Sequence, residues 1–92
     1  MNMQNNFYKK IGKKIRDARN EIGLTLEELN ERTGLNLSKG SFSSMENGKQ
    51  QISIYQLHRI ANALGVPLNS FFDELENESD FPASDKKIIN EL

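Results

Sequence analysis

The segment from Thr25 to Gly48 constrains the fold more than any other part of the chain. Thr25 is followed three residues later by Glu28, a spacing at which the hydroxyl and the carboxylate cap the start of a helix reciprocally. Gly34 can adopt the left-handed conformation that ends a helix, and the hydroxyl of Ser38 can cap the next one. The segment therefore predicts two short helices in close succession, joined by a turn.

The second of these helices has one apolar and one polar face. Phe42 and Met45 are three residues apart, so they share a face and are expected to pack inward. At about 100° per residue, the opposite face and its flanks carry only small or polar groups, namely Lys39, Gly40, Ser43, Ser44 and Asn47. A short exposed helix braced by a preceding helix fits the major groove of DNA. The pattern therefore indicates a DNA-binding segment.

Helical spacing of apolar residues predicts three further helices. The first covers about 6–22, the fourth follows the capping box of Ser53 and Gln56, and a short fifth begins at Pro67. The apolar stripes consist of Phe7, Ile11, Ile15, Ala18 and Ile22 in the first helix and Ile54, Leu57, Ile60, Ala61 and Leu64 in the fourth. We expect an all-α, compact five-helix domain over residues 7–75, followed by an acidic linker and short C-terminal tail over residues 76–92.

Composition narrows the class of protein. The 92 residues suffice for one compact domain, and with no cysteine and one histidine neither thiolate metal sites nor nucleophilic triads are available. Residues 1–72 hold ten basic and six acidic side chains, a net charge of plus four, whereas residues 73–92 hold two basic and seven acidic ones, a net charge of minus five. A basic body with an acidic tail is compatible with phosphate contacts. We expect no enzyme activity, cofactor or metal, and the absence of an apolar leader or membrane span favours the cytoplasm.

Four motifs in this order resemble the Cro/repressor-type helix-turn-helix proteins, also called the xenobiotic response element family. The matching residues are Ile15, Arg16 and Arg19; Leu24, Thr25 and Leu29; Leu37, Ser38, Phe42, Ser43, Glu46, Asn47 and Gly48; and Leu57, Ile60, Ala61, Ala63, Leu64, Gly65 and Val66. The resemblance implies a lambda-repressor-like fold and a regulator of transcription that binds double-stranded operator DNA.

Two residues depart from the family's pattern. The family places its turn glycine where Asn36 stands, so the connection from Gly34 to Leu37 is two residues longer here. Asn30 replaces a small alanine that normally lets the two helices approach closely. A buried amide without a partner would cost a few kcal/mol, so we expect the longer turn to make room for Asn30 and to affect the tilt of the second helix.

The resemblance also assigns roles to individual residues. DNA contact is implied for the start of the first motif helix, for the second motif helix and for the loop after it, namely Thr25, Lys39, Gly40, Ser41, Ser43, Ser44, Asn47, Lys49, Gln50 and Gln51. Arg19 and Glu46 are expected to form a structural ion pair between the first and third helices. Repression is favoured over activation, because blocking polymerase requires only occupancy of the site. The alternative is a protein-interaction or antitoxin module on the same fold.

Operators of such proteins are read as two half-sites, which requires a two-fold dimer. Phe71 and Phe72 are the expected dimerisation residues, because adjacent aromatic residues on a helix cannot both face one core. Ile88, Ile89 and Leu92 in the tail would add a second apolar strip or a contact for a protein partner. The alternative is that one phenylalanine covers the core.

Overall fold

The computed structural model describes residues 3–76, and the side chains of residues 6–73 within them. This part of the chain contains four α-helices, α1 (Met3–Glu21), α2 (Leu26–Thr33), α3 (Lys39–Glu46) and α4 (Ile54–Leu64), and the 3₁₀ helix η1 (Leu68–Glu76). No strand occurs among these residues. The expected all-α fold of five helices is therefore confirmed; the fifth helix is a 3₁₀ helix, and α1 begins before Asn6 and ends at Glu21. Residues 77–92, including the predicted apolar strip of the tail, lie outside the described residues.

The starts of α2, α3 and α4 and the ends of α2 and α4 lie at the residues that the sequence pattern indicates, whereas α3 ends at Glu46, before Gly48. The Thr25 and Ser53 side chains each accept from a backbone N–H three residues on, and both capping boxes are complete. The Ser38 side chain accepts from the backbone N–H of Ser41 at the start of α3. Gly34 and Gly65, which end α2 and α4, have φ values of +71° and +72°. At these two positions the left-handed backbone reverses the chain, and a residue with a Cβ atom would be strained.

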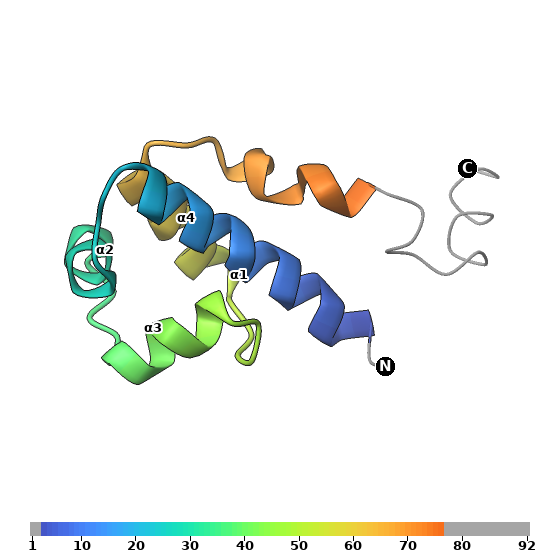
Figure 1. Ribbon diagram of the computed structural model, residues 1–92, viewed down its shortest axis with the longest axis horizontal. Coiled ribbons are helices and arrows are strands. Elements are labelled where there is room, and N and C mark those ends of the chain that lie inside the picture. Colours follow the sequence, from blue (N-terminus) through green and yellow to red (C-terminus); the bar gives the residue numbers. More distant parts are fainter. Residues whose placement is uncertain (1–2, 77–92) are drawn as a thin grey trace, which may run out of the picture.

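The long helix α1 is the centre of the arrangement. It packs against α3 on one side and against η1 on another, while α2 packs on both α3 and α4 (Figure 1). The core between them is formed by apolar side chains that are at most 8% exposed, namely Ile11, Ile15, Leu29, Phe42, Met45, Ile52, Leu57, Ile60, Ala61, Leu64 and Phe71. Phe42 and Met45 are fully buried, as predicted, so α3 turns its apolar face inward and its polar face outward.

Three residues of the apolar stripes are exposed, and for Ile54 the expected burial is wrong. Ile54 in α4 is 67% exposed, Ile22 after α1 is 47% exposed and Phe7 in α1 is 39% exposed. Each continues an apolar stripe at or near the end of its helix. Helical periodicity gives the direction of a side chain but not whether a neighbouring element reaches far enough to cover it.

Candidate nucleic-acid interface

The longer turn between α2 and α3 is closed by the side chain of Asn30. Its amide Nδ2 donates to the backbone carbonyl of Leu37, and its Oδ1 accepts from the backbone N–H of Leu37 at 3.1 Å. The amide is therefore satisfied on both sides and holds the residue that precedes the cap of α3. The two departures from the family pattern belong together, because the longer turn brings the backbone of residue 37 to the side chain that replaces alanine.

The same turn contains the only non-glycine residue with positive φ among those described. Asn36 has a φ of +56°, in the left-handed region that asparagine tolerates better than most residues. Asn36 thus adopts the conformation for which a turn glycine is normally used. The backbone N–H of Leu35 is also satisfied within the turn, because it donates to the hydroxyl of the buried Thr33.

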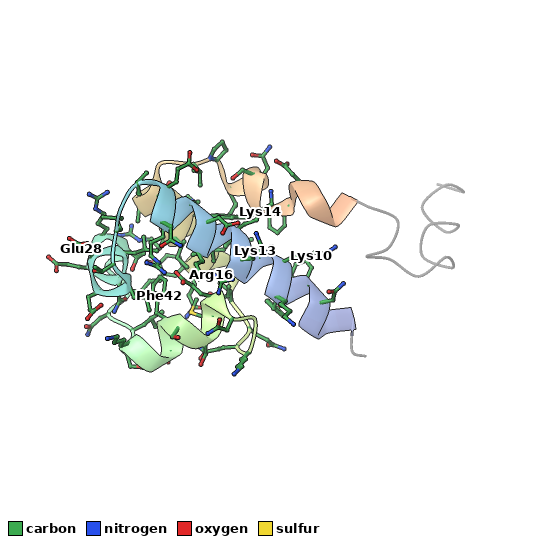
Figure 2. The ribbon with its side chains drawn as sticks, in the orientation of Figure 1. Lys10, Lys13, Lys14, Arg16, Glu28 and Phe42 are labelled. Carbon is green, nitrogen blue, oxygen red and sulfur yellow. The ribbon has the colours of Figure 1, made fainter. Side chains whose placement is uncertain are left out.

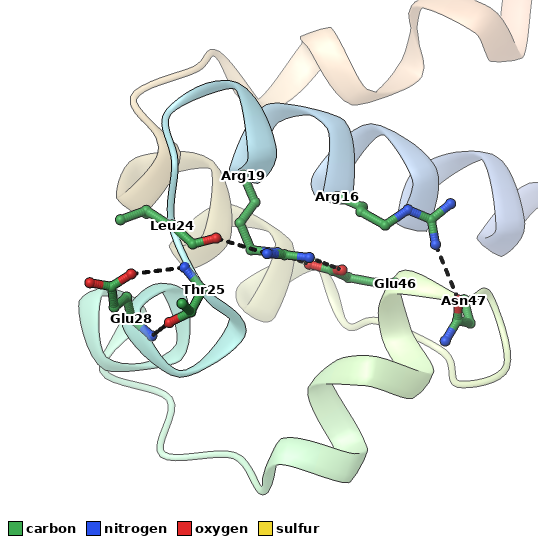
Figure 3. A network of polar contacts seen from close by, with 7 residues as sticks. All are labelled: Arg16, Arg19, Leu24, Thr25, Glu28, Glu46 and Asn47. Carbon is green, nitrogen blue, oxygen red and sulfur yellow. Dashed lines mark hydrogen bonds and ion pairs between the residues drawn. The ribbon is translucent and has the colours of Figure 1, made fainter.

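The C-terminal end of α3 is tied to α1 by a buried ion pair. Arg19 donates through Nε to Glu46 Oε2 at 2.8 Å and through Nη2 to Glu46 Oε1 at 3.0 Å (Figure 3). The Arg19 side chain is 13% exposed and that of Glu46 is 4% exposed. Arg19 Nη1 also donates to the backbone carbonyl of Leu24 at 2.8 Å. The predicted pair is thus present as a two-point contact, and its hydrogen bonds raise the pKa of Arg19 above its ordinary value.

Two glycines allow the backbones of α1 and α3 to approach closely. A Cβ atom at Gly12 in α1 would lie 2.4 Å from the carbonyl oxygen of Met45 and 2.5 Å from that of Glu46. A Cβ atom at Gly48, whose φ is +74°, would lie 2.4 Å from the Cα atom of Lys9. Neither position accepts a side chain without movement of the backbone. Gly12 was not predicted from the sequence; an isolated glycine inside a helical pattern is the signal that could have indicated it.

Most residues expected to contact DNA lie on or beside the outward face of α3. Lys39, Gly40 and Asn47 are exposed, whereas Ser41, Ser43 and Ser44 are partly buried. Nothing lies within 4 Å of a Cβ atom built at Gly40, so this part of the helix faces open space. The Lys39 ammonium is 3.6 Å from the Glu27 carboxylate, with both side chains at least 67% exposed. Such an exposed pair is weak, so the Lys39 side chain remains available to a ligand.

The other expected contact residues flank α3 in sequence. Thr25 is exposed at the start of α2, where its hydroxyl serves the capping box. In the loop after α3, Lys49 and Gln51 are exposed and Gln50 is partly buried.

An opening of about 470 Å³ between α2 and α3 is lined by Glu27, Glu31 and Lys39 among others. Among the described residues, no group of acidic, histidine and cysteine side chains could hold a metal ion.

Arg16 in α1 is an additional polar group beside α3. Its Nη1 donates to the side-chain Oδ1 of Asn47 at 3.2 Å, which joins the middle of α1 to the C-cap of α3 (Figure 3). Lys9, Lys13 and Arg16 recur at the spacing of one helix face (Figure 2 labels the latter two), and Lys9 lies against Gly48. Lys13 also pairs with Asp17 at 2.7 Å, which lowers the pKa of Asp17. From the sequence, Arg16 was predicted only as a match to the family pattern; its helical spacing from Lys9 and Lys13 is the signal that could have indicated a basic face on α1.

The expected role of Phe71 in dimerisation is wrong for this structure. Phe71 is 2% exposed and belongs to the core, because η1 lies along α1 and turns this side chain inward. Phe72 is partly buried and retains some accessible surface. The alternative in which one phenylalanine covers the core therefore applies to Phe71.

Comparisons with known proteins agree with this geometry. A helix-turn-helix family model matches residues 15–71. The chain is 45% identical over 51 residues to an uncharacterized HTH-type transcriptional regulator of Methanothermobacter thermautotrophicus, covering 55% of this chain and 71% of the relative. It is 30% identical over 69 residues to the control protein C.MunI of a Mycoplasma species, covering 75% of this chain and 92% of the relative. It spans only 59% of an uncharacterized transcriptional regulator in the ATPase CF(0) region of Rhodospirillum rubrum, at 35% identity.

A solved structure has the same arrangement of helices. The restriction-modification controller protein C.AhdI of Aeromonas hydrophila superposes with a TM-score of 0.65 and 26% identity, over 71% of this chain and 96% of that one. In the described part of the present chain, no helix is long and apolar enough to cross a membrane. Proteins of this family are DNA-binding regulators rather than enzymes. With its motif helices, its buried Arg19–Glu46 pair and a family match over residues 15–71, the chain belongs to the helix-turn-helix family of DNA-binding transcriptional regulators.

Proposed function

We propose that this protein binds a specific operator in double-stranded DNA through the outward face of α3 and represses transcription by occupying that site. The observation that carries the proposal is the construction of α3. Its apolar side chains are fully buried and its C-terminal end is held by the Arg19–Glu46 pair, while Lys39, Gly40 and Asn47 remain exposed. A rigidly held helix with a small polar outer face can enter the major groove closely.

Phosphate contacts are supported by the groups around α3. Lys49 and Gln51 are exposed in the loop that follows it, and Arg16 is tied to Asn47 at its end. Arg16 is therefore added to the proposed contacts, because its guanidinium has further N–H donors beyond the one on Asn47. These contacts position the protein on the duplex and make its binding sensitive to salt.

The outward face of α3 offers few side chains for direct contacts to bases. Gly40 offers no side chain, and Ser44 offers only a hydroxyl group that is partly buried. Lys39 at the first turn of α3 is the long donor on the outward face and is assigned the main base contact. The remaining specificity is expected to come from bridging water and from the sequence-dependent shape of the DNA. We further propose that the operator contains two half-sites and that a homodimer binds them. The proposed location of the protein is the cytoplasm.

Lys39 and Lys49 form a matched pair for testing the proposal, because both are exposed lysines near α3. An operator is first selected from a random duplex pool, and binding is then measured by fluorescence anisotropy on that operator and on a scrambled duplex. Lys39→Ala should weaken operator binding by about 1–3 kcal/mol and change scrambled binding little. Lys49→Ala should weaken both about equally and reduce the slope of log affinity against log salt by about one.

Two results would contradict the proposal. Equal losses for both variants on both duplexes would refute the division between base and phosphate contacts. A pool from which no sequence is enriched would refute operator binding itself and favour the alternative of a protein-interaction module.

A further inference from the structure

The hydrogen bond between Arg16 and Asn47 decides which end of the Asn47 amide is left for DNA. An asparagine side chain carries one acceptor oxygen, Oδ1, and one donor nitrogen, Nδ2. Arginine only donates, so the atom that meets Arg16 Nη1 at 3.2 Å is Oδ1. Figure 3 shows this oxygen turned toward α1 and the amide nitrogen turned away from it. Within the described part of the chain, no group accepts a hydrogen bond from Asn47 Nδ2.

The backbones that carry these two side chains are fixed relative to each other. Gly12, one turn before Arg16, lies so close to α3 that an added Cβ atom would be 2.5 Å from the carbonyl oxygen of Glu46. Arg19, one turn after Arg16, donates to the Glu46 carboxylate at 2.8 Å. Asn47 follows Glu46 directly, as the C-cap of α3. The packing of α1 on α3 therefore keeps the Arg16 guanidinium within reach of the Asn47 amide.

Asn47 belongs to the outward face of α3, where base contacts are proposed. It is exposed and follows Gly40 and Ser44 on the same face at helical spacing. An unconstrained asparagine recognises adenine by two hydrogen bonds, because its oxygen accepts from N6 while its nitrogen donates to N7. That pairing requires both ends of the amide to face one base edge. With Oδ1 turned toward α1, Asn47 can present only its N–H groups to the same base.

We propose that Arg16 is a positioning residue that makes Asn47 a hydrogen-bond donor toward guanine and prevents its two-point pairing with adenine. Guanine presents two acceptors in the major groove, N7 and O6, whereas adenine presents one acceptor and one donor. The inference rests on the proposed function, since it concerns the operator that α3 binds. It adds a specificity role to Arg16, whose remaining N–H donors still serve the proposed phosphate contact.

The test compares the wild type with Arg16→Met, with Asn47→Ala and with the two substitutions combined, each used to select duplexes from a random pool. Methionine keeps an unbranched apolar stem and favours a helix, but it has no N–H donor. We expect Arg16→Met to shift the preference at one base pair of the half-site from guanine toward adenine by about tenfold. In the Asn47→Ala background, Arg16→Met should weaken all duplexes alike and leave the base preference unchanged. Thermal unfolding checks that every variant folds.

Nuclear magnetic resonance of the protein without DNA provides a second readout. The side-chain amide resonances of Asn47 should move in Arg16→Met and stay in place in Lys13→Met, a matched change of an exposed basic residue on α1. Three results would overturn the inference: unmoved Asn47 resonances, a wild-type base preference in Arg16→Met, or the same shift in preference without the Asn47 amide. A wild type that enriches no sequence although the resonances respond would instead refute the proposed function, and with it the base preference, while the Arg16–Asn47 contact would stand.

Discussion

The two ends of α3 are attached to the rest of the protein by different kinds of contact. The N-terminal end follows a turn closed by the Asn30 side chain, and its Lys39 makes an exposed ion pair with Glu27. The C-terminal end is held by the buried Arg19–Glu46 pair and by backbone contact at Gly12. One end depends on side chains near solvent, and the other on a buried charge pair and close backbone packing.

This difference indicates which part of the helix sets its position and which part sets its tilt. A buried charge pair tolerates little displacement, because separation leaves a charge without solvent or partner. A turn held by an amide can change length or residue type as long as its polar groups stay satisfied. We therefore expect the C-terminal end of α3 to act as the fixed point and the longer turn to set the tilt of its N-terminal end.

The largest expected effect is that of Glu46→Ala. The substitution leaves the Arg19 charge in a site where it is only 13% exposed, and we expect a loss of unfolding free energy on the order of 3 kcal/mol. Thermal unfolding without DNA measures it. Lys13→Ala is the control, because the Lys13–Asp17 distance of 2.7 Å is close to the 2.8 Å of the Arg19–Glu46 pair, but its side chains are 65% and 58% exposed. The control should cost below about 1 kcal/mol, and equal losses would show that burial does not distinguish the two pairs.

Gly12→Ala should have the next largest effect. The added Cβ atom meets the carbonyl oxygens of Met45 and Glu46 at 2.4 and 2.5 Å, so α1 and α3 must move apart. We expect a net loss of about 1–3 kcal/mol, despite the higher helix propensity of alanine. Gly40→Ala is the matched control in α3, because open space surrounds the added Cβ atom there. The higher helix propensity of alanine alone should then raise the free energy of unfolding by up to about 1 kcal/mol. Chemical denaturation measures both, and changes of the same sign would refute the close approach.

Asn30→Ala tests the N-terminal end of α3. It restores the residue that the family prefers but leaves the backbone N–H and carbonyl of Leu37 without their partner. We expect a cost of about 1–2 kcal/mol and faster amide hydrogen exchange at Leu37. Asn62→Ala, which removes an exposed asparagine paired with His58, should be close to neutral. If Asn30→Ala cost as much as Glu46→Ala, the two ends of α3 would be held equally firmly.

The smallest expected effect is a pH dependence at the start of α2. The backbone N–H of Thr25 donates to Glu28 at 2.8 Å and lowers the pKa of Glu28 from its ordinary value of 4.5. Because the folded-state pKa lies below the unfolded one, this contribution to stability is present above pH 4.5 and disappears as the pH falls through the folded value. Glu28→Gln retains a capping acceptor that does not titrate. The melting temperature of the wild type should therefore fall relative to this variant as the pH is lowered from about 5 to about 3. A difference in melting temperature that does not change with pH would show that Glu28 is not the titrating group.

Local signals in the sequence predicted the helices well. The caps at Thr25, Ser38 and Ser53 depend on residues within three positions, so they can be recognised without knowledge of the fold. The Arg19–Glu46 pair is separated by 27 positions and was available only through resemblance to the family. Gly12 and the exposed Ile54 were missed because close approach and coverage are properties of the assembled helices rather than of one segment. The partner of Asn30 was missed because the longer turn had no template.

The close contact of α1 with α3 at Gly12 has a consequence for how new specificities can arise. The contacting groups on α3 are main-chain carbonyls, which every amino acid provides. Residues on the outward side, such as Gly40, can therefore be exchanged without altering how the helix is seated. Under the proposed function, libraries that randomise Lys39, Gly40 and Ser44 should change base preference while leaving the melting temperature nearly constant, which would make the scaffold suitable for engineering regulators directed to chosen DNA sites.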